Sequence, residues 1–349
     1  MTLSDEPTRV DLLTSLIGRT SRAWTAGPND ATVRLRVGAA DRDDCAVFDV
    51  SGPLQIVVGS DYVRGAGFSM YELGHMDEFD IGYYLVMANV SDVAAMGATP
   101  VGFLSVVRYP KSLDDDTFIR VMAGINEACA ATGIESVGGD VGGAASLILS
   151  GTALGACAQG GALLRSGARS GDHVLVSGVT GTAGAAMKYF RARAAGAGPG
   201  AVTPAMEAEL IEAWRRPRAE VELGIALAAS GVVTACQDTS DGLKGTLEQI
   251  ADASGVGIDI SADAVPVSVS ETVAAAAPVV GEAASAITFG DSVDFRLVFT
   301  VDGDLSAPEA AAMFPECHLL GRASDEPGVR LVHADGTVTP VPGKAWRHT

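Results

Sequence analysis

The ten residues CQDTSDGLKG, numbered 236–245, place two carboxylates and a hydroxyl directly before a glycine and a helix-like run, LKGTLEQIADA. Asp238, Ser240 and Asp241 carry these groups, and neither a histidine nor a pair of cysteines stands beside them. Oxygen ligands of this kind suit hard cations such as Mg²⁺. The stretch therefore favours metal chemistry over a nucleophile supplied by the protein.

Other aspartates stand at the ends of predicted strands. Asp43 and Asp44 open CAVFDV, Asp61 closes LQIVVGSD, and Asp140 ends SVGGD. Aspartate is also common in turns and at helix N-caps, and that interpretation is preferred for Asp43, Asp49 and Asp172 when each is taken alone.

Asp92 is a different case. It belongs to a helix-period segment, residues 80–96, in which the apolar stripe is formed by Ile81, Leu85, Ala88 and Ala95. Asp92 falls on this stripe, and Asn89 precedes it by about one turn. A carboxylate there must be paired, bound to a metal or placed at a cleft, because burying it alone is costly. A hydrogen-bonded structural role and a ligand role both remain open, but the whole set of aspartates favours Mg²⁺ with a nucleoside triphosphate.

Several familiar motifs are absent. The run SGVTGTAGAA lacks the GxGxxG spacing and the later acidic residue of a dinucleotide site, so we interpret it as a strand-to-helix turn. GxxxxGK[ST] does not occur, and the five histidines show neither HExxH nor a triad-like setting.

Composition narrows the class of partner. Lys and Arg total 24 against 43 Asp and Glu, a net charge of −19, which argues against nucleic acid or an anionic membrane and favours a small-molecule substrate. The five scattered cysteines form no CxxC pair. The start MTLSDEPTRVDLL lacks signal-peptide features and no later run approaches transmembrane length, so we expect a cytoplasmic protein.

Strand and helix patterns alternate along the chain. A short amphipathic helix over residues 10–18 and a loop to about Ala40 are followed by strands CAVFDV, LQIVVGSD, VGFLSVVRYP, ESVGGD and LILSGTALGA, with helices over 80–96 and 114–131. Later come the strands HVLVSG, VGIDI, DFRLVFTV and VRLVH, and an Ala/Gly/Pro-rich loop over 194–204. We predict an α+β fold with two domains, residues 1–160 and 161–349.

Six stretches occur in the order and spacing of a known family: DDCAVFDV, SDYVRGAGF, DIGYYLVMANVSDVAAMGATP, VGGDVGG, LRSGARSGD and DTSDGL. Across residues 43–243 the chain resembles the thiamine-monophosphate kinases, relatives of aminoimidazole ribonucleotide synthetase, selenophosphate synthetase and the hydrogenase maturation dehydratase. The resemblance implies a homodimer formed through the sheets of a mixed α/β N-terminal domain that binds ATP and Mg²⁺. A C-terminal α/β domain would complete the nucleotide and acceptor site.

The resemblance also implies roles by motif position. Metal ligands are implied at Asp43, Asp44, Asp61, Asp92, Asp140, Asp238 and Asp241, of which Asp238 and Asp241 would also be catalytic. Contacts to ATP or its phosphates are implied at Asn89, Gly139, Asp140 and Ser240. The acceptor pocket would contain Phe68, Asp294, Phe295, Arg296 and Trp346.

The departures from the family pattern lie mostly on the acceptor side. Gly67 precedes Phe68 where the family usually has histidine, and GDSVDFRL replaces GGEDYEL, which puts Val293 and Arg296 at acidic positions. Tyr84 stands where a lysine is common. Arg296 fits either a different, more anionic acceptor or a substitution on the surface of a strand.

Three functions follow from these observations. The leading one is ATP-dependent phosphorylation of thiamine monophosphate or of another small molecule. The second is ATP-dependent activation of a carbonyl or amide oxygen for dehydration or cyclisation, but relatives of that kind often have a reactive N-terminal or a C-terminal cysteine, which this chain lacks. The third is a non-catalytic nucleotide-binding homologue, disfavoured by the number of aspartates retained.

Overall fold

The computed structural model describes residues 23–25, 31–37, 47–63, 68–265 and 269–345. The chain divides into two compact units. The first comprises Met1–Ala162 and Trp214–Ala229, and the second comprises Leu163–Ala213 and Ser230–Thr349. The segment Trp214–Ala229 thus belongs to the same unit as the N-terminal half of the sequence. The two predicted domains, 1–160 and 161–349, did not include this return of the chain to the first unit.

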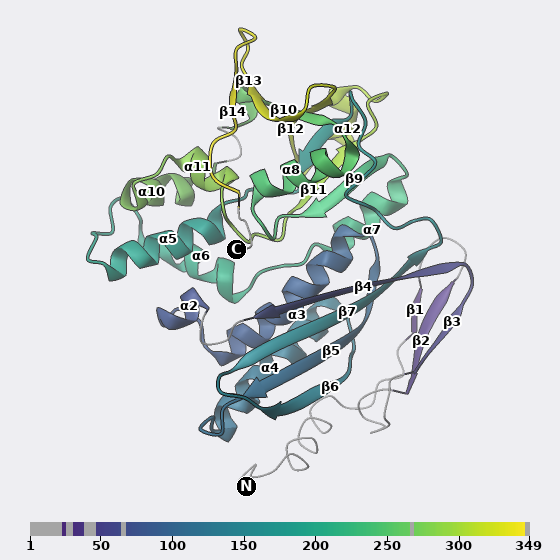
Figure 1. The fold of residues 1–349 in the computed structure, drawn as a ribbon, viewed down its shortest axis with the longest axis vertical. Coiled ribbons are helices and arrows are strands. Elements are labelled where there is room, and N and C mark those ends of the chain that lie inside the picture. Colours follow the sequence, from purple (N-terminus) through teal and green to yellow (C-terminus); the bar gives the residue numbers. More distant parts are fainter. Residues whose placement is uncertain (1–22, 26–30, 38–46, 64–67, 266–268, 346–349) are drawn as a thin grey trace. The chain divides into compact units, whose positions relative to one another are not determined.

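A four-stranded sheet forms the centre of the first unit (Figure 1). Its order is β4 (Leu54–Val63), β7 (Ile148–Ala158), β5 (Thr99–Tyr109) and β6 (Ser136–Gly143). The β4–β7 and β7–β5 pairs are antiparallel, and the β5–β6 pair is parallel. All four strands were predicted, because their apolar and β-branched runs are bounded by turn signals.

A smaller sheet corrects one prediction. The loop expected up to about Ala40 contains β1 (Ala23–Thr25) and β2 (Thr32–Val37), and β2 pairs with β3 (Val47–Ser51). Trp24, Val33 and Leu35 are buried in a core cluster with residues of the larger sheet. β1 has only three residues, but β2 has the alternating sequence TVRLRV, a strand signal that was overlooked. The helix predicted over residues 10–18 lies outside the described residues.

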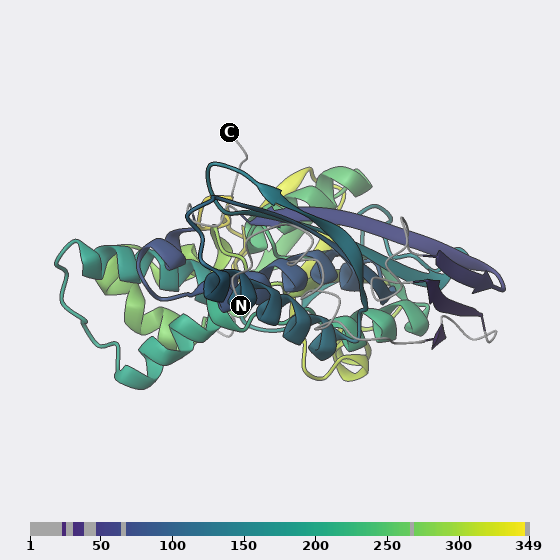
Figure 2. The same ribbon diagram turned by 90° about the horizontal axis from the view of Figure 1, so that it is seen from below.

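Two long helices cover one face of the larger sheet (Figure 2). They are α3 (Glu78–Ala95) and α4 (Asp115–Thr132), both close to the predicted ranges. They cross at two glycines, since a Cβ on Gly82 would lie 2.1 Å from the Val121 carbonyl oxygen and one on Gly124 would lie 2.0 Å from that of Phe79. The short helix α2 (Ser69–Glu72) precedes them, and α7 (Val221–Ser230) packs against α3 at Gly224.

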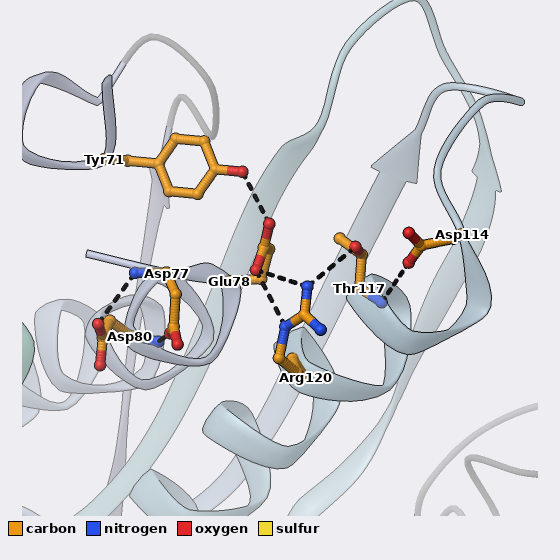
Figure 3. A network of polar contacts seen from close by, with 7 residues as sticks. All are labelled: Tyr71, Asp77, Glu78, Asp80, Asp114, Thr117 and Arg120. Carbon is orange, nitrogen blue, oxygen red and sulfur yellow. Dashed lines mark hydrogen bonds and ion pairs between the residues drawn. The ribbon is translucent and has the colours of Figure 1, made fainter. Parts of the chain in front are cut away.

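A polar network joins α2, α3 and α4 (Figure 3). The Tyr71 hydroxyl donates to Glu78 Oε1 at 2.8 Å, and Arg120 Nε donates to Glu78 Oε2 at 3.1 Å. Burial, together with the hydrogen bond to Glu78, raises the pKa of Tyr71 to about 12. Asp77 and Asp80 form a capping box that begins α3, so α2 and α3 are held firmly where the chain leaves β4.

The described residues of the second unit form a seven-stranded sheet in the order β14-β13-β10-β12-β8-β11-β9. These strands are β8 (His173–Val176), β9 (Val233–Asp238), β10 (Gly257–Ser261), β11 (Leu297–Val301), β12 (His318–Ser324), β13 (Gly328–Val332) and β14 (Val338–Pro340). The helices are α5 (Thr182–Ala194), α6 (Pro204–Arg215), α8 (Leu243–Ser254), α10 (Glu271–Val280), α11 (Ala284–Phe289) and α12 (Ala307–Met313), with a 3-10 turn at Ala262–Ala264. The loop predicted over 194–204 connects α5 to α6.

The core of the second unit lies between its sheet and α8. Leu243, Leu247 and Ile250 of that helix are fully buried against strand residues such as Val176 and Ile258. This packing fixes the start of α8 at the end of β9, where the CQDTSDGLKG stretch lies. Across the described residues, none of the helices combines the length and the apolar character needed to cross a bilayer.

Candidate active site

Asp238 is the last residue of β9, and its side chain is buried, with only 1% of the residue exposed. Ser240 Oγ donates to its Oδ1 at 3.0 Å, and the Thr246 hydroxyl donates to its backbone carbonyl at 3.0 Å. The sequence predicted that Asp238 and Ser240 act together, and the structure places them in contact. The buried carboxylate of Asp238 is held by its own loop and by the helix that follows.

The predicted helix after Asp241 begins at Leu243. Its N-cap is Gly242, whose φ of 82° suits glycine and which supplies no side-chain hydrogen bond to the first turn. The N–H groups of a first turn without a side-chain cap attract anions. Asp241 thus stands beside a helix end whose N–H groups can donate hydrogen bonds to phosphate oxygens.

The segment GDSVDFRL packs directly against this loop. A Cβ on Gly242 would lie only 2.0 Å from the Gly290 carbonyl oxygen. Thr239 N–H donates to the Arg296 carbonyl at 2.8 Å, and Arg296 N–H donates to Thr239 Oγ1 at 3.0 Å. The residues predicted for the metal and those predicted for the acceptor are therefore neighbours within the second unit. Phe295, between Asp294 and Arg296, is buried with a φ of 52°, a backbone conformation that is rare for a bulky side chain.

Asp294 has a structural partner at the N-terminus of α5. Its carboxylate accepts hydrogen bonds from the backbone N–H of Gly181 at 2.6 Å and of Ala183 at 3.1 Å. Ser292 Oγ accepts from Gly184 N–H at 2.8 Å. Burial raises the pKa of Asp294, whereas these N–H donors and the charge of Arg296 oppose the rise. The SGVTGTAGAA run is thus a strand-to-helix turn, as predicted, whose helix end is already occupied.

Arg296 is half-buried, and its guanidinium lies over the turn after β8. A Cβ on Gly178 would lie 3.3 Å from Cζ and Nε of Arg296. A residue larger than glycine at position 178 would therefore crowd this guanidinium. Arg296 is packed at the site, which differs from an ordinary surface substitution.

Asp291 is a functional candidate that the sequence analysis missed. Burial raises its pKa, the charge of Lys188 lowers it, and the negative charge of Asp241 raises it again. Asp291 therefore lies near enough to Asp241 for the two carboxylates to repel. Its position in GDSVDFRL, beside the residues already singled out, was the available signal.

The C-terminal tail also reaches this end of α8. Lys244 Nζ donates to the carbonyl oxygens of Val341 and Gly343, both at 3.1 Å. A Cβ on Gly245 would contact Asp241 Cβ at 3.6 Å and Ala345 Cβ at 3.7 Å. Trp346, predicted for the acceptor pocket, lies outside the described residues but directly follows Ala345.

The first unit places three of the predicted residues together. Asn89 Oδ1 accepts the backbone N–H of Asp61 at 2.9 Å, and Asn89 Nδ2 donates to the Leu85 carbonyl at 2.8 Å. Asp92 lies one turn further along α3, where a Cβ on Gly59 would be 3.5 Å from its Oδ2. Asn89 is fully buried, so its amide positions β4 at Asp61 beside the half-buried Asp92.

Asp140 and Gly139 lie in β6. Asp140 forms an ion pair with Arg108 of β5, and more than a third of each side chain is exposed. A Cβ on Gly139 would lie 1.8 Å from the Ser105 carbonyl oxygen, so the close approach of β5 by itself requires glycine there. Asp43 and Asp44 lie outside the described residues.

Phe68 contacts two aromatic rings within the first unit. Its ring centroid is 4.9 Å from that of Tyr84 and 5.1 Å from that of Trp214, and Tyr84 and Trp214 stack at 5.8 Å. Next to this cluster, Arg215 and Arg216 both form ion pairs with the buried Asp80. Tyr84 thus helps to attach the returning segment Trp214–Ala229 to α3.

The donor set fits Mg²⁺. Among the described residues, no three acidic, histidine or cysteine side chains gather closely enough to enclose a metal ion by themselves. Mg²⁺ rarely uses such a cage, because it is usually held by one or two carboxylates together with water and substrate phosphates. Asp238 with Asp241, and Asp61 with Asp92, offer oxygen ligands of that kind.

Comparisons with known proteins also give two domains. The AIR synthase related protein N-terminal domain matches residues 42–157, and the corresponding C-terminal domain matches residues 169–333. The thiamine-monophosphate kinase of Methanopyrus kandleri is 35% identical over 298 residues, which cover 85% of this chain and 86% of the relative. The chain belongs to the thiamine-monophosphate kinase family.

Solved structures agree with this membership. The thiamine-monophosphate kinase of Stenotrophomonas maltophilia K279a superposes with a TM-score of 0.73 at 26% identity, covering 97% of this chain and 99% of that chain. AaThiL complexed with AMPPCP and TMP has the same fold, with a TM-score of 0.69 at 22% identity and coverage of 99% and 97%. The thiamine-monophosphate kinase fold therefore extends over nearly the whole chain, including the C-terminal part where the sequence resemblance was weaker.

Proposed function

We propose that this chain transfers the γ-phosphoryl group of ATP to thiamine monophosphate, forming thiamine diphosphate with Mg²⁺ as the required cation. The observation that carries the proposal is the β9–α8 connection, where Asp238 and Asp241 precede a helix end without a side-chain cap. Membership in the family, at 35% identity to a curated thiamine-monophosphate kinase, supports the same activity.

Phosphoryl transfer suits a site without a protein nucleophile. The reaction needs donor and acceptor oxygens in line and charge stabilisation on the transferring group, which Mg²⁺ supplies when bound. Asp238 and Asp241 from the second unit, and Asp43, Asp44, Asp61, Asp92 and Asp140 from the first, would hold the cations. The first-turn N–H groups of α8 and the Ser240 hydroxyl would receive phosphate oxygens. A phosphate acceptor needs no strong general base, in keeping with the absence of a histidine from the β9–α8 loop.

The acceptor pocket is where this chain departs most from the family pattern. Val293 and Arg296 remove two acidic groups from the family pattern, and Arg296 adds a packed positive charge beside Asp294. A phosphorylated acceptor is compatible with this charge. Phe68 and Trp346 would supply apolar contacts to its body, whereas the buried Phe295 would support the pocket from behind.

A homodimer belongs to the same proposal. Strand β4 is an edge of the described four-stranded sheet, and its outward side chains include Ile56, Val58 and Tyr62, with Val58 62% exposed. An exposed apolar edge strand of this length is normally covered. We propose that a second copy of the chain covers it, and that the protein works in the cytoplasm.

Phosphorus NMR tests the activity directly. Purified protein with ATP and Mg²⁺ is expected to convert thiamine monophosphate, but not thiamine, to thiamine diphosphate, and chelation of Mg²⁺ should stop the conversion. ADP release that requires a different acceptor would redirect the proposal to a divergent kinase. ATP-dependent dehydration or cyclisation of an acceptor, or no nucleotide binding at all, would contradict it.

A variant of the β9–α8 loop tests the assigned residues. Asp241→Asn keeps the size of the side chain but removes a charged ligand, so kcat should fall by roughly two orders of magnitude or more. The melting temperature without ligand should stay unchanged. Asp252→Asn, an exposed position on the same helix, is the matched control. Normal turnover by Asp241→Asn would show that the loop has been assigned wrongly.

A further inference from the structure

Two glutamines of the second unit connect to Asp241 and have no part in the scheme above. Gln237 lies in β9 directly before Asp238, and Gln249 lies in α8. Gln249 Nε2 donates to Asp241 Oδ2 at 3.2 Å. Gln237 Nε2 in turn donates to Gln249 Oε1 at 2.5 Å. The three side chains form a chain of hydrogen bonds from the strand to the carboxylate.

The Asp241 carboxylate determines which way the hydrogen bonds in this series run. A carboxylate only accepts hydrogen bonds, so Gln249 must turn its NH₂ group toward Asp241 and its oxygen toward Gln237. Gln237 must then present its own NH₂ group to that oxygen. The reverse orientation of either amide would place two acceptors or two donors face to face.

This direction leaves one atom without a partner. Gln237 is 2% exposed, and its Oε1 is buried and has no hydrogen-bond partner among the residues that the structure describes. Burying such an oxygen costs free energy, and an apolar side chain of the same length would avoid that cost. Among the described residues, the Gln237 side chain hydrogen-bonds only to Gln249, so its polar group serves the hydrogen bond to Asp241.

We propose that Gln249 is a positioning residue that fixes the rotation of the Asp241 carboxylate for binding Mg²⁺ with nucleotide, and that Gln237 holds Gln249 in its donating orientation. This inference rests on the proposed role of Asp241. Hydrogen-bond partners of metal ligands orient those ligands, and their loss typically weakens metal binding or activity roughly 10- to 100-fold.

Isosteric variants separate positioning from packing. Gln249→Met keeps the length of the side chain without the donor, and Gln249→Glu keeps its shape but places a second acceptor against Asp241. Both should weaken Mg²⁺-dependent binding of a non-hydrolysable ATP analogue about 10-fold or more, as measured by isothermal titration calorimetry. Raised Mg²⁺ should restore turnover by Gln249→Met. Gln237→Met should give a smaller loss in the same direction without lowering the melting temperature, because it also removes the unpartnered oxygen.

The outcomes are distinct. If Gln249→Met and Gln249→Glu fold and match the parent in their Mg²⁺ dependence, the positioning role is wrong. If they lower only the melting temperature, the contact is structural and the inference also fails. Should Gln249→Met not fold, Gln237→Met decides by the same titration, with Asp252→Asn as the control. A parent chain that binds no Mg²⁺-nucleotide would instead overturn the proposed function itself.

Discussion

At the level of single residues, the Asp294 carboxylate replaces the N-cap side chain that α5 lacks. Gly181 provides the backbone turn, with a φ of 89°, and Asp294 accepts its N–H and that of Ala183. The cap therefore comes from a segment more than a hundred residues away in sequence. Burial raises the pKa of this carboxyl, so the contribution of Asp294 to the free energy of unfolding depends on pH.

The pH dependence of stability should reveal this coupling. Because the pKa of Asp294 is higher in the folded than in the unfolded chain, its contribution is most favourable below the unfolded pKa of about 3.9 and is lost as pH rises through the folded pKa. Urea denaturation from about pH 4 to about pH 7 should show the parent losing free energy of unfolding relative to Asp294→Asn. A constant difference across that range would contradict the assignment.

Some site residues could be predicted from the sequence and others could not. Asp238, Ser240 and Asp241 share one loop, so their proximity followed from the spacing alone. Asp291 was missed because its closeness to Asp241 arises only when a distant loop packs against the β9–α8 connection. Gln249 was missed although it is only eight residues from Asp241, because the spacing does not show that its side chain turns back to that carboxylate. For Gly139, the close approach of β5 supplies a steric reason for glycine that no motif indicated.

At the level of elements, the first unit depends on how closely α3 and α4 approach. The main chains of the two helices meet at Gly82 and Gly124, where a methyl group would sit about 2 Å from a carbonyl oxygen of the other helix. α3 carries both Asn89 and Asp92, and it approaches the sheet at other glycines, since a Cβ on Gly151 would lie 2.5 Å from Asn89 Nδ2. The lengths of α3 and α4 were predictable from their apolar periodicity, but the crossing point was not, since a helical glycine shows no partner in the sequence.

Gly124→Ala tests the crossing. Alanine would favour the helix by about 1 kcal/mol, but the clash with Phe79 should separate the helices and lower the free energy of unfolding by about 1–3 kcal/mol. Chemical denaturation measures the difference. Gly143→Ala is the control, because a Cβ there meets nothing within 4 Å. A Gly124→Ala protein as stable as the parent would show that the helices are not in direct contact.

At the level of the whole molecule, the chain has 43 acidic residues against 24 basic ones, although its proposed ligand is itself anionic. Bound cations and backbone N–H groups can supply the positive potential that a nucleotide needs in such a chain, as the β9–α8 connection allows. Composition and motif order were enough to predict this class and the two-unit organisation. The return of Trp214–Ala229 to the first unit was beyond them, because it rests on tertiary contacts such as those of Trp214 with Phe68 and Tyr84.

The proposed homodimer gives a prediction at the same scale. Val58→Lys places a charge in the outward face of β4 and should shift the protein from dimer to monomer in analytical ultracentrifugation, because burying an unpaired lysine is costly. Met313→Lys, which changes an exposed apolar residue on α12, should leave the dimer intact. A parent chain that sediments as a monomer would contradict the proposed interface.

The central claim is that separate aspartates hold one magnesium-loaded nucleotide. A crystal structure with Mg²⁺ and a non-hydrolysable ATP analogue tests it most directly. The account predicts cations bound by Asp92 and by Asp241, each also coordinated by phosphate oxygens of the same nucleotide. A nucleotide bound elsewhere, or bound there with no cation on either carboxylate, would contradict it.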